Sequence, residues 1–367
     1  MTLAAWLHDL GPFLWEIRPG VGLRWYGLSY VAGFVLGYFA LRFLARRGAT
    51  PIPAERAMDV IMYAALGAVV GGRLGYVLFY QPSLLWDFSS SFPWWGVFEL
   101  QRGGMASHGG IVGVILVGFL VARGFKTEAG TRVGRAPVLH VLDVFSLLAP
   151  FGLLLGRLAN FVNGELLGRI VARAGEPAPW WSVRFPQEAL ERPDELSDAQ
   201  REGLLRAVGL DPASLGPAGW DGEFKARYEA LLRKLQAGSD EAARLIEPWI
   251  NARHPSQLYQ AAAEGLAVGL IIWLIARRPR KPGVVGVWFL ISYGVLRVVT
   301  EFWRLPDAHL ATARIAGLSR GQWLSVLMVL AGIAALAIIQ SRRAPRMGGW
   351  SARTAQPEAA SSDASAS

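Results

Sequence analysis

The chain has 367 residues, of which 53% are hydrophobic and 18% are charged, and its mean hydropathy is +0.31. These values are typical of a membrane protein. Cysteine is absent, which excludes disulfides, thiolate metal sites and a cysteine nucleophile supplied by the chain. The formal net charge of +9 could point to nucleic acid, but the basic residues cluster in short loops between apolar segments. Such clustering indicates membrane topology, so we expect no nucleic-acid partner.

Seven apolar segments of about 20 residues are long enough to cross a hydrocarbon core as helices. Arginine and lysine follow the first, third, fifth and seventh segments, and the alternate loops hold far fewer. By the positive-inside rule the N-terminus lies outside and the C-terminus in the cytoplasm. We therefore predict an all-α polytopic membrane protein with seven transmembrane helices. The segments are 24–44, 57–80, 107–123, 139–160, 256–277, 283–303 and 319–341.

The pattern divides the chain into four parts. Residues 1–163 hold an N-terminal amphipathic segment and the first four transmembrane helices, and residues 254–343 hold the last three. Residues 164–253 form a charged, proline-containing insert, whose place between the fourth and fifth helices makes it an extracytoplasmic head. Residues 344–367 have too few apolar side chains to pack, so we predict a disordered cytoplasmic tail.

Several glycine pairs are spaced four residues apart inside the apolar segments. Examples are Gly67 with Gly71 and Gly109 with Gly113. This spacing favours close packing of neighbouring helices in a membrane.

Three arginines interrupt the apolar segments, and an arginine at the bilayer centre costs about 3 kcal/mol on insertion scales. At about 1.5 Å per residue, Arg73 lies about 24 Å, Arg157 about 27 Å and Arg297 about 21 Å from the cytoplasmic end of its segment. Tyr26 and His108 lie at the outer ends of the first and third segments. All five residues thus fall in the outer half of the membrane, which predicts a single polar site there.

Helical spacing connects further polar residues to this site. Arg297 and Glu301 lie at i and i+4, so they should form an ion pair. A buried arginine held by a carboxylate keeps its planar fork oriented for a second acceptor, and a phosphate is the natural candidate. Arg157 and Asn160 share a helix face. The face that carries the predicted ion pair consists of Tyr293, Arg297, Glu301 and Arg304.

Each of these residues also has an ordinary interpretation. Arg73, Arg157 and, less readily because it lies farther inside, Arg297 could extend to the membrane interface. His108 could be a packing histidine, although glycines surround it and allow close approach of a ligand. Tyr26 and Tyr259 could belong to the interfacial aromatic belt.

Five blocks of the sequence resemble the bacterial prolipoprotein diacylglyceryl transferase family. The block GRLANFVNGE, from Gly156 to Glu165, is similar to the family signature. The resemblance covers the seven apolar segments, about residues 20–345, and the insert is longer than is usual in the family. The other blocks are GGRLGYVLFY, GGMASHGG, RHPSQLYQ and YGVLRVVTEFWRLPD.

The resemblance implies that a diacylglyceryl group moves from phosphatidylglycerol to the lipobox cysteine thiol of a preprolipoprotein signal peptide. A thioether forms and glycerol phosphate leaves. It also implies a multi-pass protein of the bacterial inner membrane, with an active site that faces the outer leaflet. Arg157 and Arg297 match the essential arginines, and His108 matches a histidine proposed as the base. Phosphatidylglycerol would be bound by these two arginines with Tyr26, Arg73, Asn160, Asn163, Glu165, Gly168, Tyr259 and Glu301.

The chemistry is a substitution at a carbon that bears a phosphate ester. Its barrier falls if Arg157 or Arg297 neutralises the departing phosphate. The attacking thiol, with a free pKa near 8.5, loses its proton either to His108 or with no dedicated base, because a nearby guanidinium lowers the thiol pKa. We expect no metal ion and no cofactor, since the sequence shows no metal-ligand spacing.

Two other functions compete with this one. A transporter would also carry charges inside the membrane, but its halves are usually related by a repeat, which is not seen here. Another lipid-modifying enzyme, such as an acyltransferase or a hydrolase, is the second alternative. The stretch GLSRG at 317–321 matches a nucleophile motif, yet it opens a membrane helix and lacks the strand-turn-helix setting.

Overall fold

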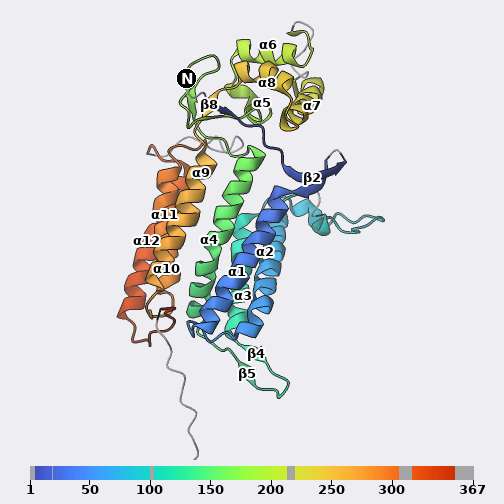
Figure 1. Cartoon of the computed structure of the whole chain (residues 1–367). Helices are drawn as coiled ribbons and strands as arrows, with labels where there is room; N and C mark the ends of the chain where they lie inside the picture. Colours follow the sequence, from blue (N-terminus) through green and yellow to red (C-terminus); the bar gives the residue numbers. More distant parts are fainter. Residues whose placement is uncertain (1–4, 19, 100–102, 213–219, 306–315, 352–367) are drawn as a thin grey trace, which may run out of the picture. The chain divides into compact units, whose positions relative to one another are not determined.

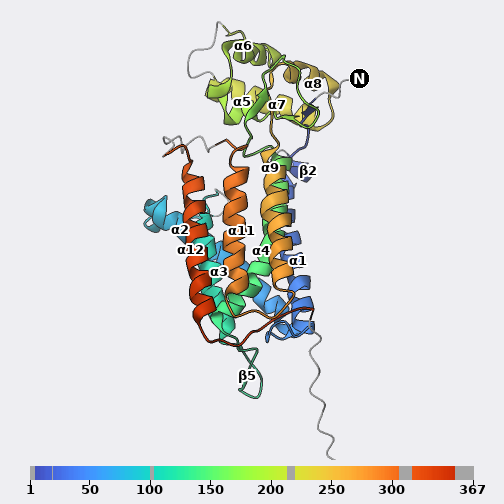
Figure 2. The ribbon, with the colours of Figure 1, turned by 90° about the vertical axis from the view of Figure 1, so that its left-hand side faces the viewer.

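The computed structural model describes residues 5–18, 20–99, 103–212, 220–305 and 316–351. It is rich in helices (Figures 1 and 2) and divides into two compact units. Several long helices contribute residues to both units. Unit 1 is Met1–Ala32, Gly152–Val268 and Ser292–Val329, and unit 2 is Gly33–Phe151, Gly269–Ile291 and Leu330–Ser367.

Each predicted apolar segment forms a helix. Within the described residues, five helices have the length and composition to cross a membrane, and α3 and α11 are shorter apolar helices. The prediction of a helical protein with membrane-spanning segments is therefore confirmed at this level. The bounds are α1 Trp25–Arg46, α2 Ala57–Phe79 with η1 Ala54–Arg56 before it, α3 Ser107–Ala122, α4 Val138–Asn163, α9 Ser256–Gln260 continued by η9 Ala261–Ala267 and α10 Val268–Ile275, α11 Val284–Thr300 and α12 Arg320–Ser341.

Helices α2 and α3 of unit 2 pack together through glycines. A Cβ atom on Gly71 would lie 2.3 Å from the carbonyl oxygen of Gly109, and one on Gly113 would lie 1.9 Å from that of Gly67. Any side chain at these positions would push the two backbones apart. The close packing predicted from the glycine spacing is confirmed for these four residues.

The insert of unit 1 folds around its own apolar core. Helix α6 begins with a capping box in which Ser197 and Gln200 bond to each other's backbone. The core includes the buried side chains of Phe224, Tyr228 and Ile246. Figure 1 shows the four helices grouped together. They are α5 Glu188–Glu191, α6 Asp198–Ala207, α7 Lys225–Gln236 and α8 Asp240–Ile246, with the short helices η5 Pro193–Glu195, η7 Trp220–Phe224 and η8 Glu247–Trp249.

Short strands join the helices, so the all-α prediction is correct for the apolar segments and too narrow for the rest. A four-stranded sheet in unit 1 has the order β1-β7-β8-β6, and only the β1-β7 pair is parallel. The N-terminal amphipathic segment forms a hairpin, β2-β3, because Leu14, Glu16 and Arg18 alternate with Trp15 and Ile17 along β2. The strands are β1 Trp6–Leu7, β2 Phe13–Arg18, β3 Val21–Arg24, β4 Phe125–Lys126, β5 Arg132–Val133, β6 Ile170–Ala172, β7 Val183–Arg184 and β8 Ala252–Arg253.

Residues 344–351 of unit 2 are ordered, so the tail predicted from residue 344 is wrong for this stretch. Met347 and Arg280 exchange two backbone hydrogen bonds, and the indole of Trp350 donates to the carbonyl of Trp273 at 2.9 Å. One large aromatic side chain is enough to dock a segment whose average composition is polar. The rest of the predicted tail, 352–367, lies outside the described residues.

Candidate active site

A buried carboxylate, Glu264, joins two of the intramembrane arginines in unit 1. Arg157 of α4 donates from Nε and Nη2 to Oε2 of Glu264, at 3.2 and 3.0 Å. Arg297 of α11 donates from Nη1 to Oε1 of the same residue at 3.2 Å. The Glu264 side chain is fully buried, whereas 17% of Arg157 and 14% of Arg297 is exposed. The carboxylate therefore lies on the buried side of both guanidinium groups.

Glu264 can reach both arginines because of the local backbone. It lies within the π-helical segment η9, whose wider turn changes the direction of its side chains relative to an α-helix. The next residue, Gly265, has no side chain, and a Cβ there would lie 2.7 Å from Cα of Leu154 on α4. The two backbones thus approach closely enough for a glutamate to span the gap.

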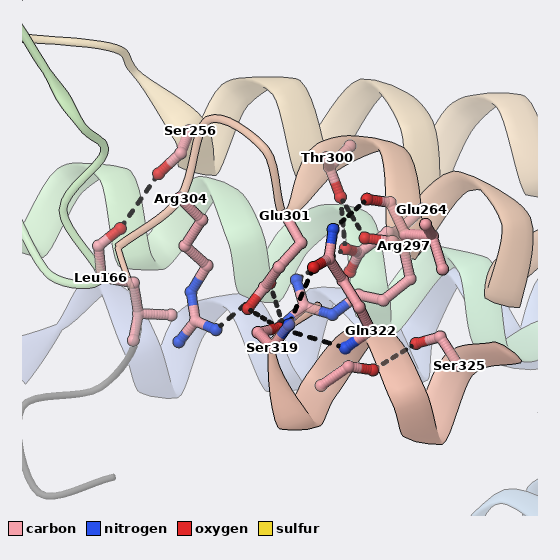
Figure 3. Close-up of polar contacts among 12 residues, drawn as sticks. Leu166, Ser256, Glu264, Arg297, Thr300, Glu301, Arg304, Ser319, Gln322 and Ser325 are labelled. Atoms are coloured by element: carbon pink, nitrogen blue, oxygen red, sulfur yellow. Dashed lines mark hydrogen bonds and ion pairs between the residues drawn. The ribbon is translucent and has the colours of Figure 1, made fainter. Parts of the chain in front are cut away.

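The ion pair predicted between Arg297 and Glu301 is present. Nη2 of Arg297 lies 3.1 Å from Oε2 of Glu301, and Nη1 of Arg304 lies 3.7 Å from the same oxygen. Figure 3 shows Glu301 between the two arginines, and Thr300 beside Glu264, to which it donates at 3.3 Å. The cluster thus contains three guanidinium groups and two carboxylates.

The serine of the GLSRG stretch has a structural role at the start of α12. The backbone amide of Gln322 donates to Oγ of Ser319 at 3.2 Å, and that of Ser319 donates to Oε1 of Gln322 at 3.0 Å. This reciprocal pair is a capping box. The Ser319 hydroxyl also donates to Oε1 of Glu301 at 3.3 Å, as Figure 3 shows. Among the described residues Ser319 contacts no histidine, and its hydrogen bonds are those of a helix cap and of a partner to a carboxylate.

A second polar group surrounds the end of α4. The side-chain amide of Asn160 donates to the hydroxyl of Tyr26 at 2.9 Å and to Oε2 of Glu165 at 3.2 Å. That of Asn163 donates to Oε1 of Glu165 at 2.9 Å. The structure thus brings together four of the residues that the motifs predicted for lipid binding.

Gly168 lies where two backbones meet. A Cβ there would lie 2.1 Å from the carbonyl oxygen of His254, so no other residue fits without a shift. The Gly168 carbonyl accepts from Nη1 of Arg253 at 3.1 Å. Arg253 is fully buried and also forms ion pairs with Glu188 and Glu195. This glycine therefore fixes the chain that follows the Asn160 group, and its contacts are with the protein itself.

Aromatic rings extend from the insert to the end of α11. Trp181 stacks on His254 with centroids 5.1 Å apart, and Tyr259 contacts both His254 and Trp303 at 5.9 Å. Burial, together with the charge of Arg169, lowers the pKa of His254, so the ring is neutral at pH 7. Tyr259 is thus part of an aromatic row, where its hydroxyl also approaches Nδ1 of His254 at 3.4 Å.

The other two predicted residues, Arg73 and His108, lie in unit 2. The buried guanidinium of Arg73 donates to four backbone carbonyls, those of Val97 and Gly96 at 2.7 and 2.8 Å and those of Gly103 and Gly104 at 2.8 and 3.0 Å. These contacts hold the connection that contains η2 (Pro82–Leu85) and η3 (Gly96–Phe98). His108 is exposed in the first turn of α3.

Glu264, Ser319 and Gln322 were not predicted from the sequence. Glu264 had a usable signal, because it is the single acidic residue between 256 and 277, in the middle of an apolar segment. A lone acid in such a segment requires a partner. Ser319 and Gln322 had the spacing of a capping box. In the described part of the chain, no three His, Asp or Glu side chains are close enough to hold a metal ion.

Comparison with known proteins identifies the family. A model of the family described as prolipoprotein diacylglyceryl transferase matches residues 12–338. The chain belongs to the prolipoprotein diacylglyceryl transferases. The match includes both units and every residue of the Glu264 cluster, and it confirms the resemblance drawn from the five blocks.

Similar members of the prolipoprotein diacylglyceryl transferases share the name phosphatidylglycerol–prolipoprotein diacylglyceryl transferase. The one from Bdellovibrio bacteriovorus is 37% identical over 357 residues, which are 94% of this chain and 97% of the relative. The relative from Ralstonia pickettii is 38% identical, and the match covers 86% of this chain and 89% of the relative. The relative from Neisseria gonorrhoeae is 36% identical, and the match covers 89% of this chain and 94% of the relative. Because the first match covers so much of the chain, it has to include most of the insert 164–253.

Proposed function

We propose that Arg157 and Arg297 bind the phosphate of phosphatidylglycerol while this enzyme transfers the diacylglyceryl group to a prolipoprotein. The family membership supports the reaction. The observation that supports the site is the meeting of two guanidinium groups, from α4 and α11, at one buried carboxylate. Part of each arginine side chain stays exposed, 17% of Arg157 and 14% of Arg297, and a planar guanidinium fork suits a phosphate.

The reaction follows from this arrangement. The sulfur of the lipobox cysteine attacks the glyceryl carbon, an S–C bond forms, and the C–O bond to the phosphate breaks. The electron pair of that bond passes to the phosphate oxygen, so negative charge grows where the arginines lie. The thiol proton leaves in the same process, either to His108 or to solvent if a guanidinium lowers the thiol pKa.

The remaining predicted residues support the two arginines. Glu301 holds Arg297 and Arg304. Tyr26, Asn160, Asn163 and Glu165 form the neighbouring hydrogen-bonded group, which offers polar partners for the glycerol headgroup. Tyr259 adds an aromatic side chain beside Trp303. Gly168 allows its own backbone and that of His254 to approach closely. For Arg73 a lipid contact stays a prediction, because its described contacts are with the loop.

The proposed topology has seven spans, with the N-terminus outside and the C-terminus in the cytoplasm of a bacterial inner membrane. It supposes that α3 and α11 also cross the membrane, although they are short. The basic residues that follow alternate helices support this orientation. The insert 164–253 then lies outside the cytoplasm, and the active site faces the outer leaflet.

The transfer reaction can be tested with the purified full chain. Incubation with phosphatidylglycerol and a peptide that carries a lipobox cysteine is expected to add the mass of one diacylglyceryl group to the peptide and to release glycerol phosphate. A peptide with serine in place of that cysteine is the control. An unchanged cysteine peptide, in a preparation that keeps its melting transition, would contradict the proposed function.

The orientation can be tested because the chain has no cysteine. Ala237→Cys introduces a unique thiol after α7 in the insert, and Glu128→Cys introduces one between β4 and β5. Both positions are exposed. In spheroplasts a membrane-impermeant maleimide is expected to label Ala237→Cys at once and Glu128→Cys only after the membrane is opened. The reverse pattern would overturn the topology.

A further inference from the structure

We propose that Glu264 is a positioning residue that holds Arg157 and Arg297 at a fixed spacing and offsets part of their charge, so that product leaves. This inference rests on the proposed function and adds a residue that none of the family blocks contains. Glu264 would not touch the lipid, because its side chain is fully buried behind the two arginines.

The carboxylate of Glu264 accepts hydrogen bonds on both of its oxygens, and these bonds fix the spacing of the two arginines. Oε2 accepts two N–H groups of Arg157, and Oε1 accepts from Arg297 and from the Thr300 hydroxyl. Four donors on two oxygens fix the carboxylate and leave both guanidinium groups with one orientation. A phosphate that binds to their exposed edges then meets two forks that are already in place.

Substrate and product differ in the negative charge that they bring to the cluster. The five groups joined by ion pairs are three arginines and two glutamates, a formal sum of +1. Phosphatidylglycerol carries one negative charge on its phosphodiester. Cleavage of the C–O bond turns this into a phosphomonoester with a charge of about −1.5 to −2 at pH 7. Without the charge of Glu264 the sum would be +2, and the more negative product would be held more tightly than it is at +1.

Two substitutions separate spacing from charge. Glu264→Gln keeps the length of the side chain and removes its charge, whereas Glu264→Asp keeps the charge and shortens the reach by one methylene. We expect Glu264→Gln to lower kcat about tenfold or more and to strengthen inhibition by added glycerol phosphate about fivefold or more. Glu264→Asp should lower kcat by a similar factor and leave the inhibition constant of glycerol phosphate unchanged.

The matched control is Glu241→Gln, which makes the same chemical change at an exposed position of α8, outside the cluster. It is expected to change neither the inhibition constant nor, beyond about threefold, kcat. If Glu264→Gln and Glu264→Asp both retain the wild-type kcat and inhibition constant, Glu264 has no such role. If Glu264→Gln does not insert, the kcat of Glu264→Asp decides the spacing argument, and a wild-type value overturns it. A wild-type protein that transfers nothing would instead reject the proposed function.

Discussion

Arg73 and Arg157 interrupt apolar helices in the same way, yet their side chains end in different surroundings. Arg73 in unit 2 uses four of its five N–H groups on backbone carbonyls, which engages all three nitrogens of the guanidinium. Arg157 in unit 1 directs Nε and Nη2 to the carboxylate of Glu264. Both arrangements compensate a buried charge, but the second pairs the guanidinium with a carboxylate and leaves 17% of the Arg157 side chain exposed.

The described contacts of Arg73 hold a loop, whereas we propose that Arg157 binds the lipid phosphate. A set of backbone carbonyls around a guanidinium holds a loop and engages most of its donors, whereas a buried carboxylate orients the guanidinium. The depth of an arginine along its helix therefore identifies a polar environment and does not identify its use. The predictions below test the contrast.

The largest effect is expected for the arginines of unit 1. Arg157→Ala and Arg297→Ala should each reduce kcat/KM for diacylglyceryl transfer by about 10² or more, because the charge that develops on the phosphate loses its partner. The measurement is the rate of peptide lipidation at several phosphatidylglycerol concentrations. Full activity in either variant would remove the proposed phosphate site.

Arg157→Lys and Arg297→Lys are the controls for charge alone. Lysine keeps the positive charge and lacks the planar fork, so we expect most of the loss to remain. Recovery of wild-type rates with lysine would mean that charge, and not bidentate geometry, is what the site requires.

A loss of stability without a matching loss of chemistry is expected for Arg73. Arg73→Met leaves four backbone carbonyls without their donor and should destabilise the fold by about 3 kcal/mol, seen as a lower melting temperature in detergent. Transfer per folded molecule should persist. If transfer disappears while the melting temperature is unchanged, Arg73 binds lipid and the contrast with Arg157 is broken.

A smaller effect is expected at the start of α12. Ser319→Ala removes the N-cap and should cost about 1 kcal/mol of stability. Lipid transfer is expected to continue, because Ser319 contacts Glu301 and is not a nucleophile in this arrangement. Ser319→Thr, which retains the capping hydroxyl, should restore the melting temperature. Complete inactivation of both variants would instead favour a hydrolase-like role for this serine.

The smallest effect is a pH dependence that involves His8. Burial lowers the pKa of His8, and the neutral ring fits its contacts, since Nε2 lies 2.8 Å from the carbonyl of Phe161 and Nδ1 lies 3.3 Å from the amide nitrogen of Gln187. The unfolded chain thus binds a proton more readily than the folded one. Stability should be fully present above the unfolded pKa of about 6.5 and fall as pH drops below it.

This dependence can be measured as the melting temperature between about pH 7.5 and pH 5.5. The control is His8→Gln, whose side chain does not titrate in this range and which should flatten the curve. A wild-type curve that is flat, or that rises toward acid pH, would show that the ring is not held in its neutral form.

The sequence by itself determined the apolar helices, the ion pair of Arg297 with Glu301 and the family. These features depend on short-range patterns: hydropathy over about 20 residues, the i, i+4 spacing of a helix, and blocks of adjacent letters. Strand β1 and the packed segment 344–351 were missed because long-range pairing with β7 and one docked tryptophan, respectively, outweigh local composition there.

Only the tertiary structure decided which charges meet. Glu264 lies 107 positions from Arg157 and 33 from Arg297, and no local pattern connects residues so far apart. A π-helical turn and a glycine that allows two helices to touch bring them together. The tertiary structure also places backbone carbonyls around the guanidinium of Arg73. A buried charge without partners costs free energy, and this is the physical reason that each of these arginines is paired.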